Sequence, residues 1–397
     1  MKTIQINNIT ELNKTGRSCC APPQNPGLLA PDLQMRQKAI KAISSITAEK
    51  PPWIIGTINT EYGLVPVVSP DWSHADRWGH IRSRMSAFRM NYAINPGLYA
   101  IGTPDADSDI FVSANYKFSF DILRRELMGI NGWILVLDTK GINVWCAAGK
   151  GTFGTDELVR RITAANLAGL VAHRRIIVPQ LGATGVRATE VMRKTGFHVY
   201  FGPVEAADIK QYCTDNYRAS PEMRQIRFGI VKRLILTPIE LNQALKRYPL
   251  VALIILVIFG LQPTGVIFNN AWFEGWPYLF LCLIAIVIGA VITPLLLPFI
   301  PGRSFALKGL ITGVAAVSPL VALTPAGGES FFLKASALVL FSLLSSYLAL
   351  QFTGATTFTT ISGVKKELRI WLPIYIAGLV IAAILLVLYK IHSWGLI

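Results

Sequence analysis

The distribution of apolar residues divides the chain into two parts of different character. From residue 248 onward the sequence is nearly continuous apolar sequence broken by short loops. A helix needs about 20 predominantly apolar residues to cross a bilayer. The pattern therefore predicts a membrane domain over residues 236–397. Its five predicted spans are residues 248–268, 277–300, 306–323, 331–352 and 370–389.

The charges in the predicted loops alternate in sign along the membrane domain. Lys246 and Arg247 precede the first span, and the loops near residues 303–308 and 365–369 are also basic. The loops at 269–276 and 324–330 carry no Lys or Arg. Because basic loops stay in the cytoplasm, we expect a multi-pass protein of the cytoplasmic (inner) membrane in contact with membrane lipid. Its N-terminal domain would lie in the cytoplasm and its C-terminus outside.

The first half of the chain alternates short apolar runs with amphipathic segments. This alternation predicts a parallel sheet covered by helices, an α/β Rossmann-like domain over residues 71–235. Ser119 and Thr155 are candidate helix caps, and residues 1–70 carry little signal. The predicted strands are residues 98–102, 110–114, 132–138, 142–145, 175–179 and 198–202, and the predicted helices are 119–127, 156–171, 185–196 and 204–213.

The composition supports a membrane protein and argues against a nucleic-acid partner. The 397-residue chain is 52% hydrophobic and carries a formal net charge of +15. Such a charge is typical of a membrane protein with a basic cytoplasmic face. Runs of Lys and Arg interleaved with aromatic residues, which would indicate a nucleic-acid surface, do not occur.

One stretch, GINVWCAAGKGTFGT at residues 141–155, stands out because it places a lone cysteine after a predicted strand. It is not a phosphate-binding loop, since Val144 replaces the first glycine and Gly151 replaces the Ser or Thr of that motif. A cysteine at the start of a helix favours the thiolate, and Lys150 lies close by in sequence. Cys146 is then a nucleophile, a metal ligand or a buried structural residue.

The nucleophile interpretation requires a histidine base, and no histidine lies in a recognisable signature. The candidates are His74, His80, His173 and His198. The other cysteines are Cys19, Cys20, Cys213 and Cys282. An odd, irregularly spaced set argues against a disulfide framework. The adjacent pair Cys19 and Cys20 suits a soft metal but is too small to hold an iron–sulfur cluster.

Residues 143–150 resemble, position for position, the signature of the mercury-methylating corrinoid proteins (the HgcA family). Residues 112–127 and 181–209 are similar to the large subunit of corrinoid iron–sulfur proteins, and the five-span tail matches the domain plan of the mercury-methylating family. The resemblance implies a cobalt corrinoid of the cobalamin type in the α/β domain. It also implies that Cys146 is the catalytic residue and the lower axial cobalt ligand. The cofactor-binding cap that it implies comprises Asn143, Val144, Trp145, Cys146, Ala147, Ala148, Gly149, Lys150, Gly151 and Thr152.

The same resemblance implies the reaction, a corrinoid-dependent methyl transfer from cobalt to inorganic Hg(II) that forms methylmercury. The expected partners are a ferredoxin-like protein with two 4Fe–4S clusters as electron donor and a methyltetrahydrofolate-type methyl donor system. One alternative is a membrane-anchored corrinoid methyl carrier of one-carbon metabolism, as in the acetyl-CoA pathway. Another is a membrane transporter or receptor with a cytoplasmic ligand-sensing domain, which the scarcity of intramembrane ionisable residues disfavours.

Overall fold

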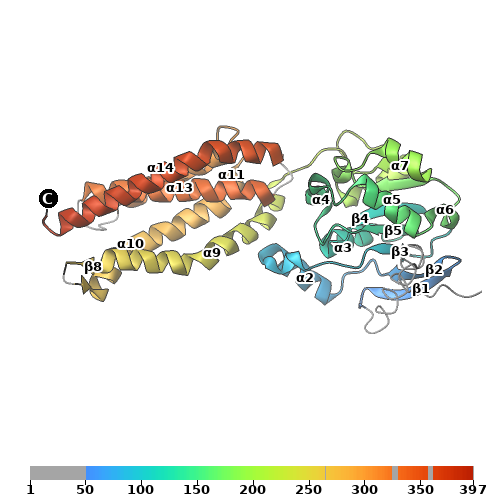
Figure 1. The fold of residues 1–397 in the computed structure, drawn as a ribbon, viewed down its shortest axis with the longest axis horizontal. Helices are drawn as coiled ribbons and strands as arrows, with labels where there is room; N and C mark the ends of the chain where they lie inside the picture. The colour runs from blue at the N-terminus through green and yellow to red at the C-terminus, as the bar shows by residue number, and fades with distance from the viewer. Residues whose placement is uncertain (1–50, 264, 324–329, 356–360, 397) are drawn as a thin grey trace, which may run out of the picture. The chain divides into compact units, whose positions relative to one another are not determined.

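A single mixed sheet forms the centre of the N-terminal part in the computed structural model, which describes residues 51–263, 265–323, 330–355 and 361–396. Seven strands lie in the order β1-β2-β3-β5-β4-β6-β7 (Figure 1). Strands β5, β4, β6 and β7 run parallel, whereas β3 is antiparallel to β5. The bounds are β1 Ile54–Thr60, β2 Gly63–Val68, β3 Gly97–Ile101, β4 Asp109–Ala114, β5 Gly132–Leu137, β6 Arg175–Val178 and β7 His198–Phe201.

The sheet differs from the all-parallel prediction at one edge. β1 and β2, to which the sequence assigned no element, form an antiparallel hairpin, and β2 joins β3 in parallel. β1 alternates half-buried and exposed positions and includes glycine, asparagine and two threonines. An edge strand of this kind buries too little apolar surface for its periodicity to be recognised.

Helices connect the strands, and several of their ends differ from the predictions. Residues 142–145 do not form a strand, because Asn143 caps α4 and Val144 is already helical. Tyr116, not Ser119, precedes α3, and Gly154 precedes α5. The predicted helix 156–171 breaks after Ala164, where Asn166 adopts a positive φ of 45°. The bounds are α2 His74–Met85, α3 Lys117–Glu126, α4 Val144–Lys150, α5 Thr155–Ala164, α6 Leu167–Leu170, α7 Ala188–Thr195 and α8 Ile209–Thr214.

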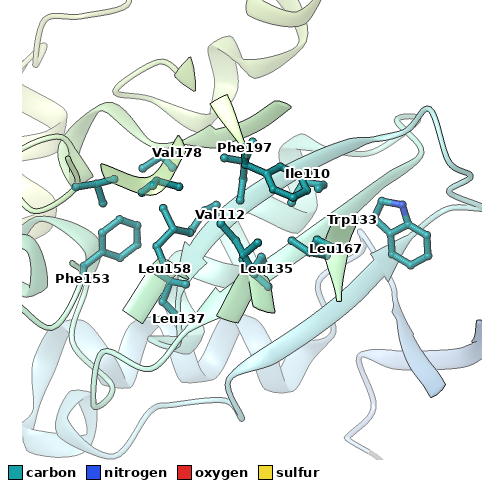
Figure 2. Packing of buried hydrophobic residues seen from close by; sticks show 14 of the residues in the cluster. Ile110, Val112, Trp133, Leu135, Leu137, Phe153, Leu158, Leu167, Val178 and Phe197 are labelled. Carbon is teal, nitrogen blue, oxygen red and sulfur yellow. The ribbon is translucent and has the colours of Figure 1, made fainter. Parts of the chain in front are cut away.

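Strand β5 is buried along its whole length and divides two hydrophobic cores. Trp133, Leu135 and Leu137 face the side on which Phe153 and Leu158 pack (Figure 2). The alternate residues Ile134 and Val136 face the side of α3 and α8. Because side chains alternate along a strand, a strand covered on both faces reads as a continuous apolar run. This explains why β5 could be predicted from the sequence.

A buried cluster of charged side chains fixes α2 against α3. Lys117 Nζ lies 2.7 Å from Asp76 Oδ1 and 2.5 Å from Asp121 Oδ1. Arg124 bonds the same two carboxylates, at 2.8 Å from Asp76 and 2.7 Å from Asp121. Burial raises the pKa of Asp76, but hydrogen bonds and charges, chiefly from Lys117, lower it overall to about 2. Two cations therefore neutralise two carboxylates inside the domain.

The C-terminal part is a bundle in which five helices are long and apolar enough to cross a membrane (Figure 1). This confirms the predicted number of apolar helices. The membrane-length helices are Ile230–Gly260, Phe268–Leu296, Phe305–Leu323, Phe331–Thr353 and Gly363–Ser393. The second of these helices contains α10 (Phe268–Val287), a π-helical turn (Ile288–Ile292) and α11 (Thr293–Leu296). The other four belong, in chain order, to α9 (Ile230–Gly260), α12 (Phe305–Leu323), α13 (Phe331–Ala355) and α14 (Ile361–Ser393).

The helix that carries the first predicted span, residues 248–268, begins before the span does and also ends before it. α9 begins at Ile230 and ends at Gly260, after which β8 (Leu261–Gln262) and β9 (Gly265–Val266) form a two-stranded turn. Pro263 and Gly265, which has a φ of 130°, stop the helix there. Two regions that the sequence analysis used lie outside the described residues. They are residues 324–329, which carry most of one predicted outer loop, and the pair Cys19 and Cys20. The predicted domain limits and membrane orientation stay predictions.

We expect Asp121→Asn to lower the free energy of unfolding by about 3–5 kcal/mol, because it leaves buried Lys117 and Arg124 with one carboxylate between them. Urea unfolding of the detergent-solubilised protein measures this effect. Asp156→Asn is the matched control, since its carboxylate is exposed and pairs with Lys194 at the surface; that variant should unfold as wild type does. Equal stability of the two variants would contradict a structural role for the buried cluster.

Candidate functional site

The chain reverses its direction of winding between β4 and β6. From β4 it passes through α3 to β5 on one side, and from β6 it passes through α7 to β7 on the other. In open α/β sheets such a switch point leaves a crevice at the carboxyl ends of the strands, where ligands bind. A cavity of about 280 Å³ lies at this place, with lining residues from both β4 and β6.

The cavity is lined almost entirely by apolar side chains and by no charged residue. Phe118 and Ser119 of α3 form one wall, and Pro179 after β6 belongs to another. Asn143, Val144 and Trp145, at the start of α4, also line it. Three of the ten predicted cap residues are thus brought to a ligand-sized crevice, whereas Cys146 itself does not belong to the lining.

Asn143 sets where α4 begins. Its side-chain Oδ1 accepts a hydrogen bond from the backbone N–H of Cys146 at 2.9 Å, which satisfies one of the free donors at the helix start. The helix ends at Gly151, whose φ of 82° is the left-handed conformation that glycine adopts readily. Thr152 then donates its backbone N–H to the carbonyl of Ala147 at 3.0 Å. Asn143, Gly151 and Thr152 therefore delimit the short helix that carries Cys146.

A buried asparagine holds the turn that leads into α4. Asn115, directly after β4, accepts three hydrogen bonds at Oδ1. The donors are the backbone N–H of Thr139 at 3.0 Å, the Thr139 hydroxyl at 2.8 Å and the backbone N–H of Gly141 at 2.9 Å. The turn needs positive φ at Lys140 (57°) and Gly141 (71°). One side chain at the end of β4 thus fixes the chain that leaves β5.

Cys146 is half-buried, and its surroundings act on the thiol in opposite directions. Burial, the largest effect, raises the pKa of Cys146, whereas the charges of Arg89 and Lys150 and the hydrogen bond with Asn143 lower it. The net pKa lies above its ordinary value. The sequence predicts that the helix start and Lys150 favour the thiolate. The charges of Arg89 and Lys150 do lower the pKa, but the effect of burial is larger. Arg89 belongs to a 3-10 turn, Ala87–Met90, that the sequence did not connect with Cys146.

The remaining predicted cap residues divide between the core and the surface. Ala147 and Ala148 are buried against the sheet, and Gly149 and Lys150 are exposed. A side chain at Gly185 would place its Cβ 3.2 Å from the Ala148 Cα and only 2.1 Å from the Phe153 carbonyl. The alanines therefore let α4 pack closely on the loop after β6.

The four histidines named as candidate bases are engaged or distant. His80 Nε2 bonds Asp121 Oδ2 at 2.9 Å, and His74 is exposed at the start of α2. His173 and His198 lie at the amino ends of β6 and β7. α4 follows the carboxyl end of the parallel strand β5, at the opposite edge of the sheet. Among the described residues, no histidine bonds Cys146, so the nucleophile interpretation lacks its base.

The part of the chain that the structure describes contains no site that could hold a metal ion by side chains alone. No group of three or more His, Cys, Asp or Glu side chains there is arranged to hold a metal ion, and Cys146 is a free cysteine. One soft sulfur donor cannot complete the coordination of a bare ion. It suits a metal that arrives with its own equatorial ligands, as in a macrocycle.

Comparison with known proteins shows which proteins this region is similar to. The model of the CO dehydrogenase/acetyl-CoA synthase delta subunit family matches residues 87–213, which include the cavity and α4. The acetyl-CoA decarbonylase/synthase complex subunit gamma of Archaeoglobus fulgidus is 31% identical over 131 residues, 32% of this chain and 27% of that protein. The corrinoid/iron-sulfur protein large subunit of Moorella thermoacetica is 28% identical over 121 residues, 30% of this chain and 27% of that protein.

The chain is therefore related to the large subunit of corrinoid/iron-sulfur proteins, as residues 112–127 and 181–209 indicated. It spans only about a quarter of the length of these curated relatives. The match ends at residue 213 and so does not reach the apolar helices.

Alkylation should report the raised pKa of Cys146. In protein without cofactor, we expect iodoacetamide to modify Cys146 more slowly at pH 8 than a cysteine in an unfolded peptide. The rate should keep rising at pH values above the ordinary thiol pKa of about 8.5, where the rate of the peptide levels off. Arg89→Gln should slow the reaction further, because it removes a charge that favours the thiolate. Arg187→Gln, an exposed arginine elsewhere, is the control. Site-resolved mass spectrometry measures the modification of Cys146. A rate equal to that of the unfolded peptide would refute the raised pKa.

Substitution of Asn115 should loosen the turn before α4. Asn115→Leu leaves the buried N–H groups of Thr139 and Gly141 without an acceptor, at a cost of about 1–3 kcal/mol for each unsatisfied group. Hydrogen exchange at Gly141 and Cys146 should accelerate, while exchange in β5 stays slow. Asn115→Asp keeps an acceptor at the same position and should retain more of the protection. Unchanged exchange in Asn115→Leu would show that the turn is held by other contacts.

Proposed function

We propose that this chain is a membrane-anchored corrinoid methyltransferase that passes a methyl group from cobalt to inorganic Hg(II), forming methylmercury. The observation that carries the proposal is the position of Cys146. It is a lone, half-buried thiol in the first turn of a helix whose start lines an uncharged crevice at the switch point. The Hg(II) acceptor itself rests on the resemblance of residues 143–150 to the mercury-methylating corrinoid proteins.

The residues present fit a cobalt corrinoid on three counts. The crevice is lined mainly by apolar side chains and by no charged residue, which suits contact with the flat face of a macrocycle. Cys146 is a single soft donor, which suffices for a metal that carries four ligands of its own. Arg89 and Lys150 lie near enough to lower the pKa of the thiol, so they would support the thiolate once the metal replaces its proton. Asn143, Val144 and Trp145 would contact the cofactor from the crevice side.

The bound corrinoid supplies a methyl group that can leave cobalt with its bonding electron pair and join a soft acceptor such as Hg(II). The residues of this chain would hold the Cys146 sulfur in position and favour its thiolate form. Cys146 must lose its proton to bind, and its raised pKa makes binding release a proton. Asn143 fixes the helix start, so the sulfur keeps one position relative to the crevice. A thiolate in this place would donate electron density to the metal and so promote departure of the methyl group.

The proposal also requires partners that the described residues do not replace. No cluster of cysteines capable of holding an iron–sulfur centre occurs within them. Electrons would come from a ferredoxin-like protein with two 4Fe–4S clusters, and methyl groups from a methyltetrahydrofolate-type donor system. The five apolar helices would anchor the α/β domain to the cytoplasmic face of the inner membrane.

A second function is supported by the comparisons themselves, a corrinoid methyl carrier of the acetyl-CoA pathway type. The relatives are named as subunits of acetyl-CoA decarbonylase/synthase complexes and as a corrinoid/iron-sulfur protein. Under this alternative the methyl acceptor would be a protein-bound metal centre instead of Hg(II). The two functions share the corrinoid and differ in the acceptor and in the need for Cys146.

Cys146→Ala should discriminate between them. We expect membranes that contain the corrinoid-loaded wild-type protein to form methylmercury when they are supplied with methyl donor, reductant and Hg(II). With Cys146→Ala, formation should fall by at least a hundredfold, while the folded protein remains in the membrane. Cys213→Ala, which removes another half-buried thiol in the same domain, should retain wild-type activity. Methylmercury formation at the normal rate by Cys146→Ala would refute the thiolate mechanism. Methyl loading without any methylmercury, even in wild type, would favour the carrier.

A further inference from the structure

Helix α2 has its polar and apolar faces reversed relative to an ordinary surface helix, which buries its apolar stripe against the core. The buried residues of α2 are polar or glycine, namely Asp76, Gly79, His80 and Ser83. Its large apolar residues are all exposed, namely Trp78, Ile81 and Met85. The bonds of Asp76 and His80 to charged side chains of α3 hold the helix in place. Packing of the α/β domain therefore does not account for the apolar residues of α2.

The exposed apolar residues of α2 form one narrow stripe with a basic residue on each side. Each residue of a helix turns by about 100°, so Trp78, Ile81 and Met85 fall within about 60° of one another. By the same spacing Arg82 lies about 40° beyond one edge of this stripe, and Arg77 lies about 40° beyond the other. A stripe of large apolar side chains between cations is typical of helices that lie in a membrane interface.

Neither arginine beside the stripe forms an ion pair with a carboxylate among the described residues. Arg77 and Arg82 are both exposed. The guanidinium of Arg82 lies 4.3 Å from the centre of the Phe88 ring, and stacking of this kind leaves the N–H groups at its edge able to donate. Both edges of the stripe therefore carry a positive charge that suits an anionic ligand.

The C-terminal end of α2 contacts the first membrane-length helix. The side-chain amide of Asn242, in α9, donates a hydrogen bond to the backbone carbonyl of Met85. Asn242 lies six residues before Tyr248, where the apolar run of the sequence begins, which is about 9 Å along the helix. The headgroup region extends roughly 5–8 Å beyond the hydrocarbon core on each side of a bilayer. The end of α2 is therefore close to the level of the lipid headgroups.

We propose that α2 is an interfacial helix that docks the α/β domain on the anionic surface of the membrane. Trp78, Ile81 and Met85 enter the boundary between headgroups and acyl chains, where the amphipathic ring of tryptophan is favoured. Arg77 and Arg82 remain at the level of the lipid phosphates and donate hydrogen bonds to their oxygens. The bilayer is the occupant that the observations favour, because α2 meets α9 near the headgroup level and its stripe has cations on both sides. The proposal rests on the membrane location of the chain and is independent of methyl transfer.

Hydroxyl-radical footprinting of the full chain in lipid nanodiscs tests the docking. Met85 and Met192 are each 46% exposed in the structure, so Met192, in α7, is a matched internal control. In nanodiscs of phosphatidylcholine mixed with phosphatidylglycerol, mass spectrometry should show Met85 oxidised about fivefold more slowly than Met192, because lipid covers it. In phosphatidylcholine alone, or in high salt, this protection should largely disappear.

Two outcomes would overturn the proposal. Equal oxidation of Met85 and Met192 in the anionic nanodiscs would mean that lipid does not cover the stripe, which would then be left for a protein partner. Equal protection of Met85 in both lipid compositions would mean that a second copy or another segment of this chain covers it.

A matched pair of double substitutions tests the role of the arginines. Each basic residue near an anionic surface favours the docked state about fivefold, so Arg77→Gln combined with Arg82→Gln should remove the protection. Arg187→Gln combined with Arg193→Gln takes the same charge from exposed positions near α7 and should leave the protection intact. Met223, which is only 5% exposed, should stay unoxidised in all proteins and so report that the domain is folded. Full protection after loss of both arginines of α2 would contradict the docking. None of these measurements involves cobalt or mercury, so their failure would leave the proposed methyl transfer untouched.

Discussion

The carboxamide oxygen of Asn115 is the contact on which the candidate site depends. It accepts three hydrogen bonds from the turn that follows β5, although Asn115 itself ends β4. Because β4 and β5 are adjacent parallel strands, this one group joins two strand ends and fixes how the chain leaves the sheet. Asn143 can then cap α4, and Cys146 is presented from the first turn of that helix. A shift of the turn would move the sulfur with it.

The electrostatics of Cys146 suit a resident ligand better than a reactive thiol. Burial holds its pKa above the ordinary value, so the protein without cofactor keeps the sulfur protonated and protected. The charges of Arg89 and Lys150 oppose this effect, and they would stabilise the thiolate if a metal displaced the proton. No histidine base accompanies it in the described residues, and no second metal ligand lies nearby. The site therefore offers a single sulfur donor. Its ability to bind a ligand would depend on how accurately the sheet positions that sulfur.

Much of the architecture was predictable because it follows from burial. The parallel strands β4, β5 and β6 are continuous apolar runs, and the five long helices have the length and composition that a bilayer imposes. Residues 142–145 were mistaken for a strand because Ile, Val and Trp favour strands locally. The cap by Asn143, stabilised through Asn115 far away in sequence, decides in favour of a helix. The influence of Arg89 on Cys146 was likewise invisible, since only the folded chain brings them together.

The proposed methyl transfer depends on ligation of cobalt by Cys146, and X-ray absorption at the cobalt edge of the corrinoid-loaded protein detects such a ligand. We expect one sulfur scatterer in the first coordination shell of the wild-type protein. In Cys146→Ala, with corrinoid still bound, we expect a shell of only nitrogen, oxygen and carbon. A sulfur-free shell in the wild-type protein, or the same spectrum in both proteins, would contradict the assignment of Cys146 as the axial ligand.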